Sequence, residues 1–319
     1  ISNGVVQSCP SLLLEPASTN LFTYSEDFSQ SAWIKSAAVV TLTSQTAPDG
    51  TINSVYNLTG TNANLYTGGT TAVEYTISFY IKSNGQGKDT CKLRLGNSIS
   101  SQITATDQWI RHEFTATPTS SVFGLTVDSS PNNEWDILIW GAQVEALSYA
   151  TSYIPNFGQS AGVTRAAETC FGAGTASTFN STEGVLYAEI SALSDDVINR
   201  RIAISGVAST EFIYIYFSST STLSVRLQVG GVNEFTYNHT VDITQNNKVA
   251  FKWKLNDLSM YVNGVEVAQS NSSPVPAVNS LVSINFSSFS SDNFYGNTKD
   301  IRVFNEALTD LQLQKLTTL

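Results

Sequence analysis

Short segments rich in β-branched and aromatic residues recur along the whole sequence, separated by Gly, Asn, Asp and Pro. Over residues 38–145 a new segment begins about every 8 to 15 residues, which is the spacing of strands in a β-sandwich. One segment alternates clearly, placing Tyr75, Ile77, Phe79 and Ile81 on one face. Since no segment of this half repeats its apolar residues at a helical period, we predict an all-β, antiparallel fold without a substantial helix here.

From residue 179 onward the segments are longer and more evenly spaced. Asn263-Gly264, between two alternating segments, is the strongest hairpin signal, because both central positions of a type I′ turn need positive φ. Near the end Thr309 precedes leucines at helical spacing and is followed three residues later by Gln312. This arrangement predicts a short C-terminal helix with a capping box. The whole chain is therefore predicted to form two tandem antiparallel β-sandwiches with a short C-terminal helix.

The length of 319 residues suits two domains of roughly 150 residues each. We expect a lead segment over 1–14, a first sandwich over 15–148, a connector over 149–178 and a second sandwich over 179–319. The first residue is not Met and no signal peptide is visible, so we expect that an upstream part is missing. Three cysteines, an odd number, do not form a disulfide framework.

Charge limits the classes of partner. The formal net charge is -10, and only 13% of residues are charged. Nucleic acids and anionic membrane surfaces need clustered Lys and Arg, so neither is expected as a partner. The longest apolar runs, such as 213–217, are far shorter than the ~20 residues of a membrane helix, so no membrane insertion is expected. A neutral or weakly charged ligand fits this composition better.

Two sets of short sequence motifs resemble motifs of a known group of proteins. The first is GAQVE at 141–145, followed by ATSYIP at 150–155 and TRAAE at 164–168; the second opens the chain's first half at Thr19 to Lys35. Both resemble phrases of bacteriophage tail, spike and fibre proteins. The resemblance implies that residues 15–148 form a carbohydrate-binding-module-like jelly roll.

A second resemblance covers residues 179–319. The order GVLYAEI, KVAFKW, LSMYVNGVEV and KDIRVFNEALTDLQLQKL resembles the concanavalin A-like, laminin-G-like sandwich domains. This resemblance implies a concanavalin A-like second sandwich whose last strand runs into the short helix.

Catalytic motifs are missing from the sequence. It contains no Walker or HExxH motif, and no GxSxG nucleophile elbow, because the one GxSxG match, at residues 158–162, lies in the turn-rich stretch and not between a strand and a helix. Glycosidases of the concanavalin A-like fold need two close carboxylates, and the nearest pattern has Glu134 and Asp136 but Ile139 where the second Glu should stand. We therefore expect no enzyme and no cofactor. Jelly-roll binding modules often carry a structural calcium ion, and the candidate ligands for one in this chain are Glu15, Glu26, Asp27 and Asp136.

A glycan site needs exposed aromatic rings beside hydrogen-bonding groups. Trp33, Trp109, Trp140 and Trp253 are expected in the cores, whereas Trp135 at a strand edge is expected to be more exposed. The candidate ligand-binding residues are Trp135, Tyr24, Tyr66, Tyr214, Tyr216, Phe294 and Tyr295.

Together these observations predict a non-catalytic virion surface protein, a spike or tail fibre that recognises a host cell-surface glycan. We expect it to work outside the cell on the virion, as a homo-oligomer with a trimer favoured, alongside other virion proteins. Two alternatives stay open. One is a structural or decoration protein that contacts other capsid or tail proteins; the other is the binding module of a secreted polysaccharide-degrading enzyme.

Overall fold

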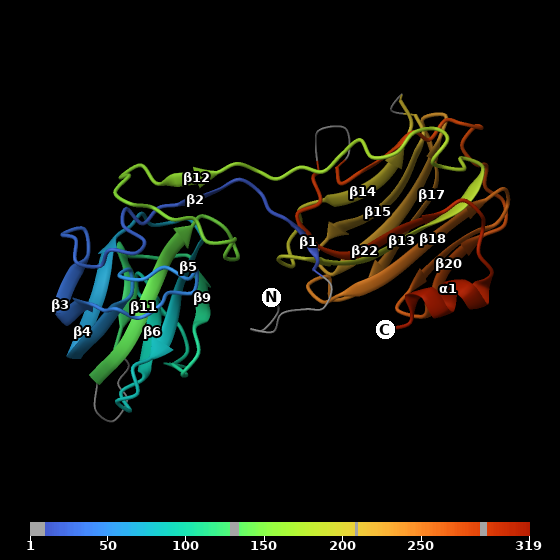
Figure 1. Cartoon of the computed structure of the whole chain (residues 1–319). Helices are drawn as coiled ribbons and strands as arrows, with labels where there is room; N and C mark the ends of the chain where they lie inside the picture. The colour runs from blue at the N-terminus through green and yellow to red at the C-terminus, as the bar shows by residue number, and fades with distance from the viewer. Residues whose placement is uncertain (1–9, 128–133, 208–209, 288–291) are drawn as a thin grey trace. The chain divides into compact units, whose positions relative to one another are not determined.

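Almost all regular structure in the computed structural model is β-strand (Figure 1). The structure describes residues 10–127, 134–207, 210–287 and 292–319, and within them it has one helix. The prediction of an all-β protein with a short C-terminal helix is confirmed. The chain divides into two compact units: unit 1 contains residues 1–16 and 167–319, and unit 2 contains residues 17–166.

Unit 2 is built from a sheet in the order β7-β6-β10-β4-β11-β5-β9, with β3 paired to β4 and β8 to β6, and from the small pair β2 and β12. β4 pairs with β11 through residues 56–61 and with β10 through residues 64–68, so it joins the two halves of this sheet. The strands are β2 (Ser18–Asn20), β3 (Ile34–Leu42), β4 (Tyr56–Gly68), β5 (Tyr75–Ser83), β6 (Thr90–Leu95), β7 (Ser98–Ile99), β8 (Ile103–Thr104), β9 (Ile110–Ala116), β10 (Val122–Thr126), β11 (Glu134–Glu145) and β12 (Val163–Arg165).

The core of unit 2 contains the predicted face of β5, since Tyr75, Ile77, Phe79 and Ile81 are all buried. The opposite face of β5 is also covered, because the ring centroid of Tyr80 lies 6.4 Å from that of Tyr153 in the expected connector. Part of the expected connector therefore packs on β5 as a covering layer.

A buried network of hydrogen bonds joins residues 18–20, at the start of unit 2, to residues 145–154 near its end. The side-chain amide of Asn20 donates to the carbonyl oxygen of Ile154 at 2.8 Å. The carboxylate of Glu145 accepts from Ser18 Oγ at 2.6 Å and from the backbone N–H of Thr151 at 3.0 Å. A buried polar group that loses its hydrogen-bond partner costs about 1–3 kcal/mol of stability. Replacing one residue of this network would therefore leave its partner unsatisfied. The expected connector over 149–178 is thus divided between the units, with residues up to 166 in unit 2.

Unit 1 is a sandwich of two antiparallel sheets with a continuous apolar core between them. One sheet has the order β1-β22-β13-β18-β19-β20 and the other the order β17-β16-β15-β14-β21. The strands are β1 (Leu12–Leu14), β13 (Glu183–Ala192), β14 (Arg200–Ser205), β15 (Phe212–Ser219), β16 (Thr222–Val229), β17 (Val232–Thr240), β18 (Asn247–Lys254), β19 (Leu258–Val262), β20 (Val265–Ser270), β21 (Ser283–Asn285) and β22 (Gly296–Phe304). β1 pairs with β22, so the expected lead segment supplies a strand of this sandwich.

The predicted hairpin and the predicted helix are both confirmed in unit 1. Asn263 and Gly264 connect β19 to β20 with φ values of 51° and 86°. The helix α1 (Asp310–Thr317) begins after Thr309 in a capping box with Gln312. α1 packs on the outer face of the six-stranded sheet, where Leu313 lies in a cluster with residues of β13, β18 and β19. The helix is too short to cross a membrane, and no other helix occurs in the described ranges.

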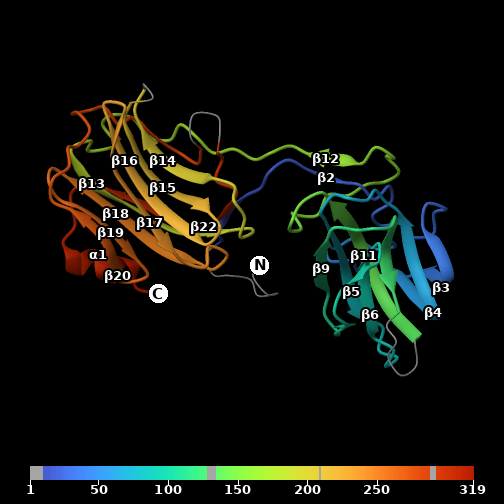
Figure 2. The ribbon, with the colours of Figure 1, turned by 180° about the vertical axis from the view of Figure 1, so that it is seen from behind.

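The described part of the chain places no helix on the outer face of the five-stranded sheet. Figure 2 shows β14, β15 and β16 side by side in this sheet, seen from behind. The inward side chains of β15, among them Ile213 and Ile215, lie in the main core, whereas Phe212, Tyr214 and Tyr216 alternate with them and form a separate cluster on the outer face. This outer face is the one that positions the candidate site.

Candidate functional site

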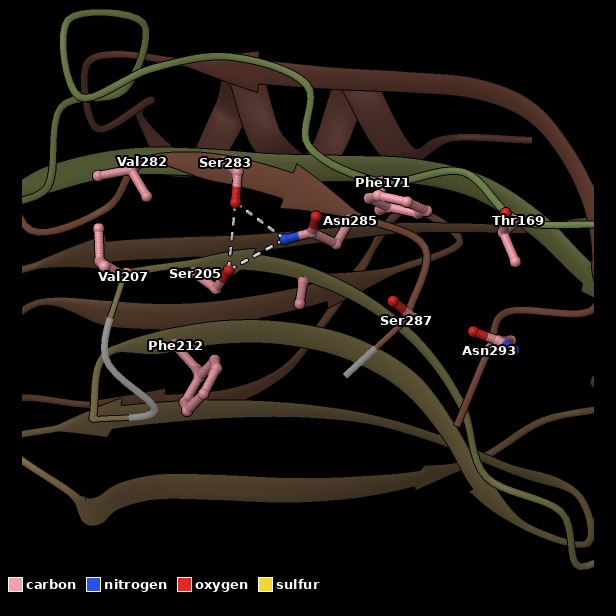
Figure 3. Close-up of a pocket in the computed structure, with 12 residues that line it drawn as sticks. Thr169, Phe171, Ser205, Val207, Phe212, Val282, Ser283, Asn285, Ser287 and Asn293 are labelled. Atoms are coloured by element: carbon pink, nitrogen blue, oxygen red, sulfur yellow. Dashed lines mark hydrogen bonds between the residues drawn. The ribbon is translucent and has the colours of Figure 1, made fainter. Parts of the chain in front are cut away.

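A pocket of about 480 Å³ lies where the outer face of the five-stranded sheet meets the segments that flank β21 (Figure 3). Strands β14, β15 and β21 supply its floor, and the segment after Ala167 supplies one rim. The lining residues are Thr169, Phe171, Ala203, Ser205, Gly206, Val207, Phe212, Val282, Ser283, Asn285, Ser287 and Asn293.

Three polar side chains in the pocket hold one another in place. The amide nitrogen of Asn285 donates to Ser205 Oγ and to Ser283 Oγ, both at 3.0 Å, and the two hydroxyls lie 3.4 Å apart (Figure 3). The amide oxygen of Asn285 accepts from the backbone N–H of Gly172 at 2.7 Å. The orientation of this amide is therefore fixed before any ligand arrives.

Phe171 is the exposed aromatic ring at the pocket, with 72% of its surface accessible. The backbone on either side of it is anchored to β21. Phe286 N–H donates to the carbonyl oxygen of Cys170 at 2.8 Å, and Ile284 N–H donates to that of Ala173 at 2.8 Å. The ring is thus presented on a backbone held by strand-like hydrogen bonds.

Beside the pocket, the rings of β15 lie beneath two guanidinium groups. Arg201 Cζ lies 5.5 Å from the ring centroids of both Tyr214 and Tyr216. Arg226 Cζ lies 5.6 Å from the centroid of Tyr216. These distances are those of cation–π contacts. The two guanidinium groups, which are planar hydrogen-bond donors, therefore cover the tyrosine rings next to the pocket.

The described lining contains hydroxyls, amides and apolar side chains but no Asp, Glu or His. It can therefore hold a polar ligand through hydrogen bonds and ring contacts. Paired carboxylates, which glycoside hydrolysis needs, are missing from these lining residues.

The residues predicted to bind ligand in unit 1 lie close to this region without forming one surface. Tyr216 is buried beneath the two arginines, and Phe294 is fully buried in the core. Tyr295 is half-buried, and its hydroxyl accepts from Asn293 Nδ2 at 2.8 Å. Asn293 lines the pocket, so it connects Tyr295 to the candidate site.

The other predicted residues lie in unit 2. Trp135 is 1% exposed and packs in the core, so the expectation that it is exposed is wrong. Its strand β11 is covered on this face, with the core of unit 2 closing over the ring. Tyr24 and Tyr66 are half-buried, the first beside Phe157 and the second on β4. The predicted residues are therefore spread over both units.

The remaining tryptophans follow the expectation with one exception. Trp33, Trp140 and Trp253 are buried as predicted. Trp109 is only half-buried, and its indole N–H donates to the carbonyl oxygen of Thr46 at 3.0 Å.

The candidate calcium ligands bind neighbouring protein groups instead of meeting one another. Glu26 accepts from the hydroxyl of Tyr153 at 3.0 Å, and Asp136 accepts from the amide of Asn84 at 2.8 Å. Asp27 accepts from several local donors, and Glu15 lies in unit 1. Within the described ranges no group of three or more His, Cys, Asp or Glu side chains could hold a metal ion.

Sequence reasoning missed the residues that form the pocket. Phe171 stands alone between Cys170 and Gly172, a lone aromatic in a polar, glycine-rich stretch. Such a ring has no strand partner to pack against, and this was the available signal for exposure. Ser205 and Asn285 carried none, because Ser and Asn occur throughout this sequence.

Part of unit 1 matches a known protein family. The family described as the concanavalin A-like lectin/glucanases superfamily matches residues 190–314, less than half of the chain. A search of curated proteins finds no match.

Solved structures with a similar fold include the carbohydrate-binding module, CBM40, of the Ruminococcus gnavus IT-sialidase bound to α2,3 sialyllactose. It is 14% identical, with 48% of this chain and 97% of that chain covered and a TM-score of 0.40. The leech intramolecular trans-sialidase is 17% identical, with 44% and 24% covered and a TM-score of 0.38. A pentraxin from Limulus polyphemus is 16% identical, with 45% and 72% covered and a TM-score of 0.36. The family match and the two-sheet core together show that unit 1 contains a concanavalin A-like domain.

Proposed function

We propose that this protein is a non-catalytic recognition protein that binds a glycan in the pocket beside Phe171. One observation carries the proposal: an exposed aromatic ring stands next to a pre-oriented set of hydroxyl and amide groups, in one pocket. The C–H faces of sugars stack on aromatic rings, and sugar hydroxyls need paired donors and acceptors. The pocket offers both kinds of contact.

Residues 190–314 match a family whose description names lectins and glucanases. Binding is favoured over hydrolysis at this pocket because its described lining has no carboxylate pair.

We further propose that the glycan belongs to a host cell surface and that the protein is a bacteriophage spike or tail fibre, exposed on the virion. The phrases at 141–145, 150–155 and 164–168 support this placement through their resemblance to such proteins. A homo-oligomer, with a trimer favoured, would multiply a weak affinity of each single site. Antibody labelling of intact virions and the mass of the native protein by sedimentation test these two statements. Unlabelled virions or a monomeric mass would contradict them.

A module of a secreted polysaccharide-degrading enzyme would use the same pocket in the same way. The gene that encodes this chain separates the two cases, because only that alternative places a signal peptide and a catalytic domain upstream.

A structural role in contact with other virion proteins has its own supporting observation. The strand β3 exposes Ile34, Val39 and Leu42. Exposed apolar side chains on a strand at a sheet edge favour contact with another protein. This role predicts that no glycan binds at all.

Replacement of Phe171 tests the glycan proposal. Against a glycan array or whole host cells, Phe171→Ala should lower the affinity about tenfold or more, since loss of a stacking ring at a site costs at least about 1.4 kcal/mol. Phe157→Ala is the matched control, because Phe157 is 71% exposed but belongs to unit 2, whereas the pocket residues belong to unit 1.

If the glycan site lay in unit 2 instead, the results for the two variants would be reversed. If Phe157→Ala abolished binding and Phe171→Ala left it unchanged, the glycan site would lie in unit 2 near Tyr24. If the unmodified protein bound no glycan and no cell, the structural role would replace the proposal.

A further inference from the structure

We infer that the glycan bound beside Phe171 is acidic and that the guanidinium of Arg226 pairs with its anionic group. This inference rests on the proposed function and adds the chemical class of the ligand.

Arg226 differs from the other arginines of its sheet in having no acidic partner. It projects from the outer face of β16, above the ring of Tyr216. Its Nη2 lies 3.4 Å from the Tyr216 hydroxyl, and its buried Nε has no hydrogen-bond partner. No Asp or Glu among the described residues forms an ion pair with it. Arg200, by contrast, makes two hydrogen bonds to the carboxylate of Asp196, at 2.8 and 2.6 Å.

The surroundings of Arg226 are unusually poor in negative charge. The chain contains 26 Asp and Glu, yet β14, β15, β16 and β21 contain none. Acidic residues lie at the edges of this sheet. Asp292 forms an ion pair with Arg201 at 3.2 Å, Glu234 lies at the bulge of β17, and Glu211, which directly precedes β15, accepts from the backbone N–H of Gly230 at 3.0 Å. Arg226 is therefore a guanidinium without a paired carboxylate on a protein of formal net charge -10, contrary to the neutral or weakly charged ligand that the net charge favours.

The arginine lies within reach of a ligand in the pocket. Ala203, which lines the pocket, pairs in register with Tyr214, and Tyr214 pairs with Arg226. Two strand spacings separate the Ala203 and Arg226 backbones, a distance of roughly 10 Å. An oligosaccharide seated against Phe171 can extend across this distance.

The geometry of Arg226 suits an oxyanion. A guanidinium presents parallel N–H donors that match a carboxylate or a phosphate group, and the ring beneath it restricts its orientation. The Nη groups of Arg226 would donate to the anion, and the nearest acidic side chain described above, Asp292, is already paired with Arg201.

The test uses the full chain and three oligosaccharide probes of equal length in titration calorimetry. One carries glucuronate, one is the same oligosaccharide with the carboxyl group reduced to the neutral alcohol, and one is that neutral oligosaccharide with a 6-phosphate. We expect at least one acidic probe to bind about tenfold or more tightly than the neutral probe, with the preference falling as salt rises. The stronger acidic probe identifies the anionic group as carboxylate or phosphate.

Arg226→Gln should reduce the affinity for the acidic probe to that for the neutral probe, while the affinity for the neutral probe stays unchanged. Retained neutral binding shows that the variant is folded. Arg226→Lys should keep part of the preference, because it keeps the charge but loses the paired donors. Arg302→Gln is the control: Arg302 lies 5.7 Å from the Tyr187 ring on the other sheet, so its loss should change neither affinity.

The outcomes separate the two proposals. If none of the probes and no host glycan binds, the proposed function fails. If the neutral probe binds as tightly as both acidic ones, or if Arg226→Gln retains the preference, the inference about the acidic ligand is wrong and the glycan site stands.

Discussion

Asp27 shows how the carboxylates of unit 2 are used locally. Its carboxylate accepts from Ser29 Oγ at 2.5 Å, Gln30 Nε2 at 2.7 Å and the Tyr56 hydroxyl at 2.7 Å. Partial burial raises the pKa of Asp27, but these hydrogen bonds outweigh it and lower the pKa from 3.8 to about 2. The resulting stabilisation is complete above the ordinary pKa and is lost as pH falls from about 4 through about 2.

Removal of one donor should show which groups set this pKa. Tyr56→Phe should raise the pKa of Asp27 toward 3.8, because one of the hydrogen bonds to the charged form is lost. The carboxyl titration followed by NMR measures it. Tyr66→Phe, on the same strand, should leave it unchanged. An Asp27 pKa that stayed near 2 in Tyr56→Phe would show that Ser29 and Gln30 alone hold it there.

At single residues the sequence was a poor guide to exposure. Trp135 and Phe171 both stand beside turn-rich stretches, yet one is in a core and the other is on a rim. The exposure of such a residue depends on whether a segment distant in the sequence covers it. The pattern of neighbouring residues carries no information about distant segments. Trp253 was predictable because it lies within an alternating strand, β18, whose inner face is fixed by the period of two. Trp33 precedes β3, and Trp140 lies on the face of β11 opposite to Ile139, so strand alternation does not explain their burial.

At the scale of elements, features with a local cause were predictable. The Asn263-Gly264 hairpin and the Thr309 capping box depend on backbone conformation and on neighbours within a few residues. The strand β17 could not be predicted in this way. Its residues are mostly exposed, and it is held by pairing with β16, so it shows little apolar alternation.

The capping box gives an element-scale prediction. Thr309→Ala should destabilise unit 1 by about 1 kcal/mol, because the N–H of Gln312 loses its side-chain acceptor at the end of α1. Chemical denaturation monitored by the fluorescence of Trp253, the tryptophan in the core of unit 1, measures it. Thr309→Ser should retain nearly full stability. Equal losses in both variants would show that the methyl group matters and the cap does not.

At the scale of the whole molecule, unit 2 occupies the chain between β1 and β13 of unit 1. Leu12 pairs with Thr298, and Leu14 is in the core at 6% exposure. The sequence could not reveal this, because a three-residue strand has too few positions to show a period, and its partner lies near the other end of the chain. The match of the C-terminal half to a known sandwich pattern carried the fold prediction instead.

Two substitutions in β1 test its role. Leu14→Ala should lower the free energy of unfolding of unit 1 by about 2–3 kcal/mol through loss of buried surface and the cavity left behind. Leu12→Ala, at 43% exposure on the same strand, should change it by far less. Equal effects would mean that β1 acts through its backbone pairing alone.

The pairing of β1 with β22 also sets an order of events during translation. Leu12–Leu14 leave the ribosome before unit 2, whereas Gly296–Phe304, their partners, are made only after unit 2 is complete. Residues 17–166 are complete long before that point, so unit 2 can fold on the ribosome while the sandwich that carries the pocket beside Phe171 waits for its closing strand. A chain stalled before residue 296 would therefore resist protease in unit 2 and remain cleavable in unit 1.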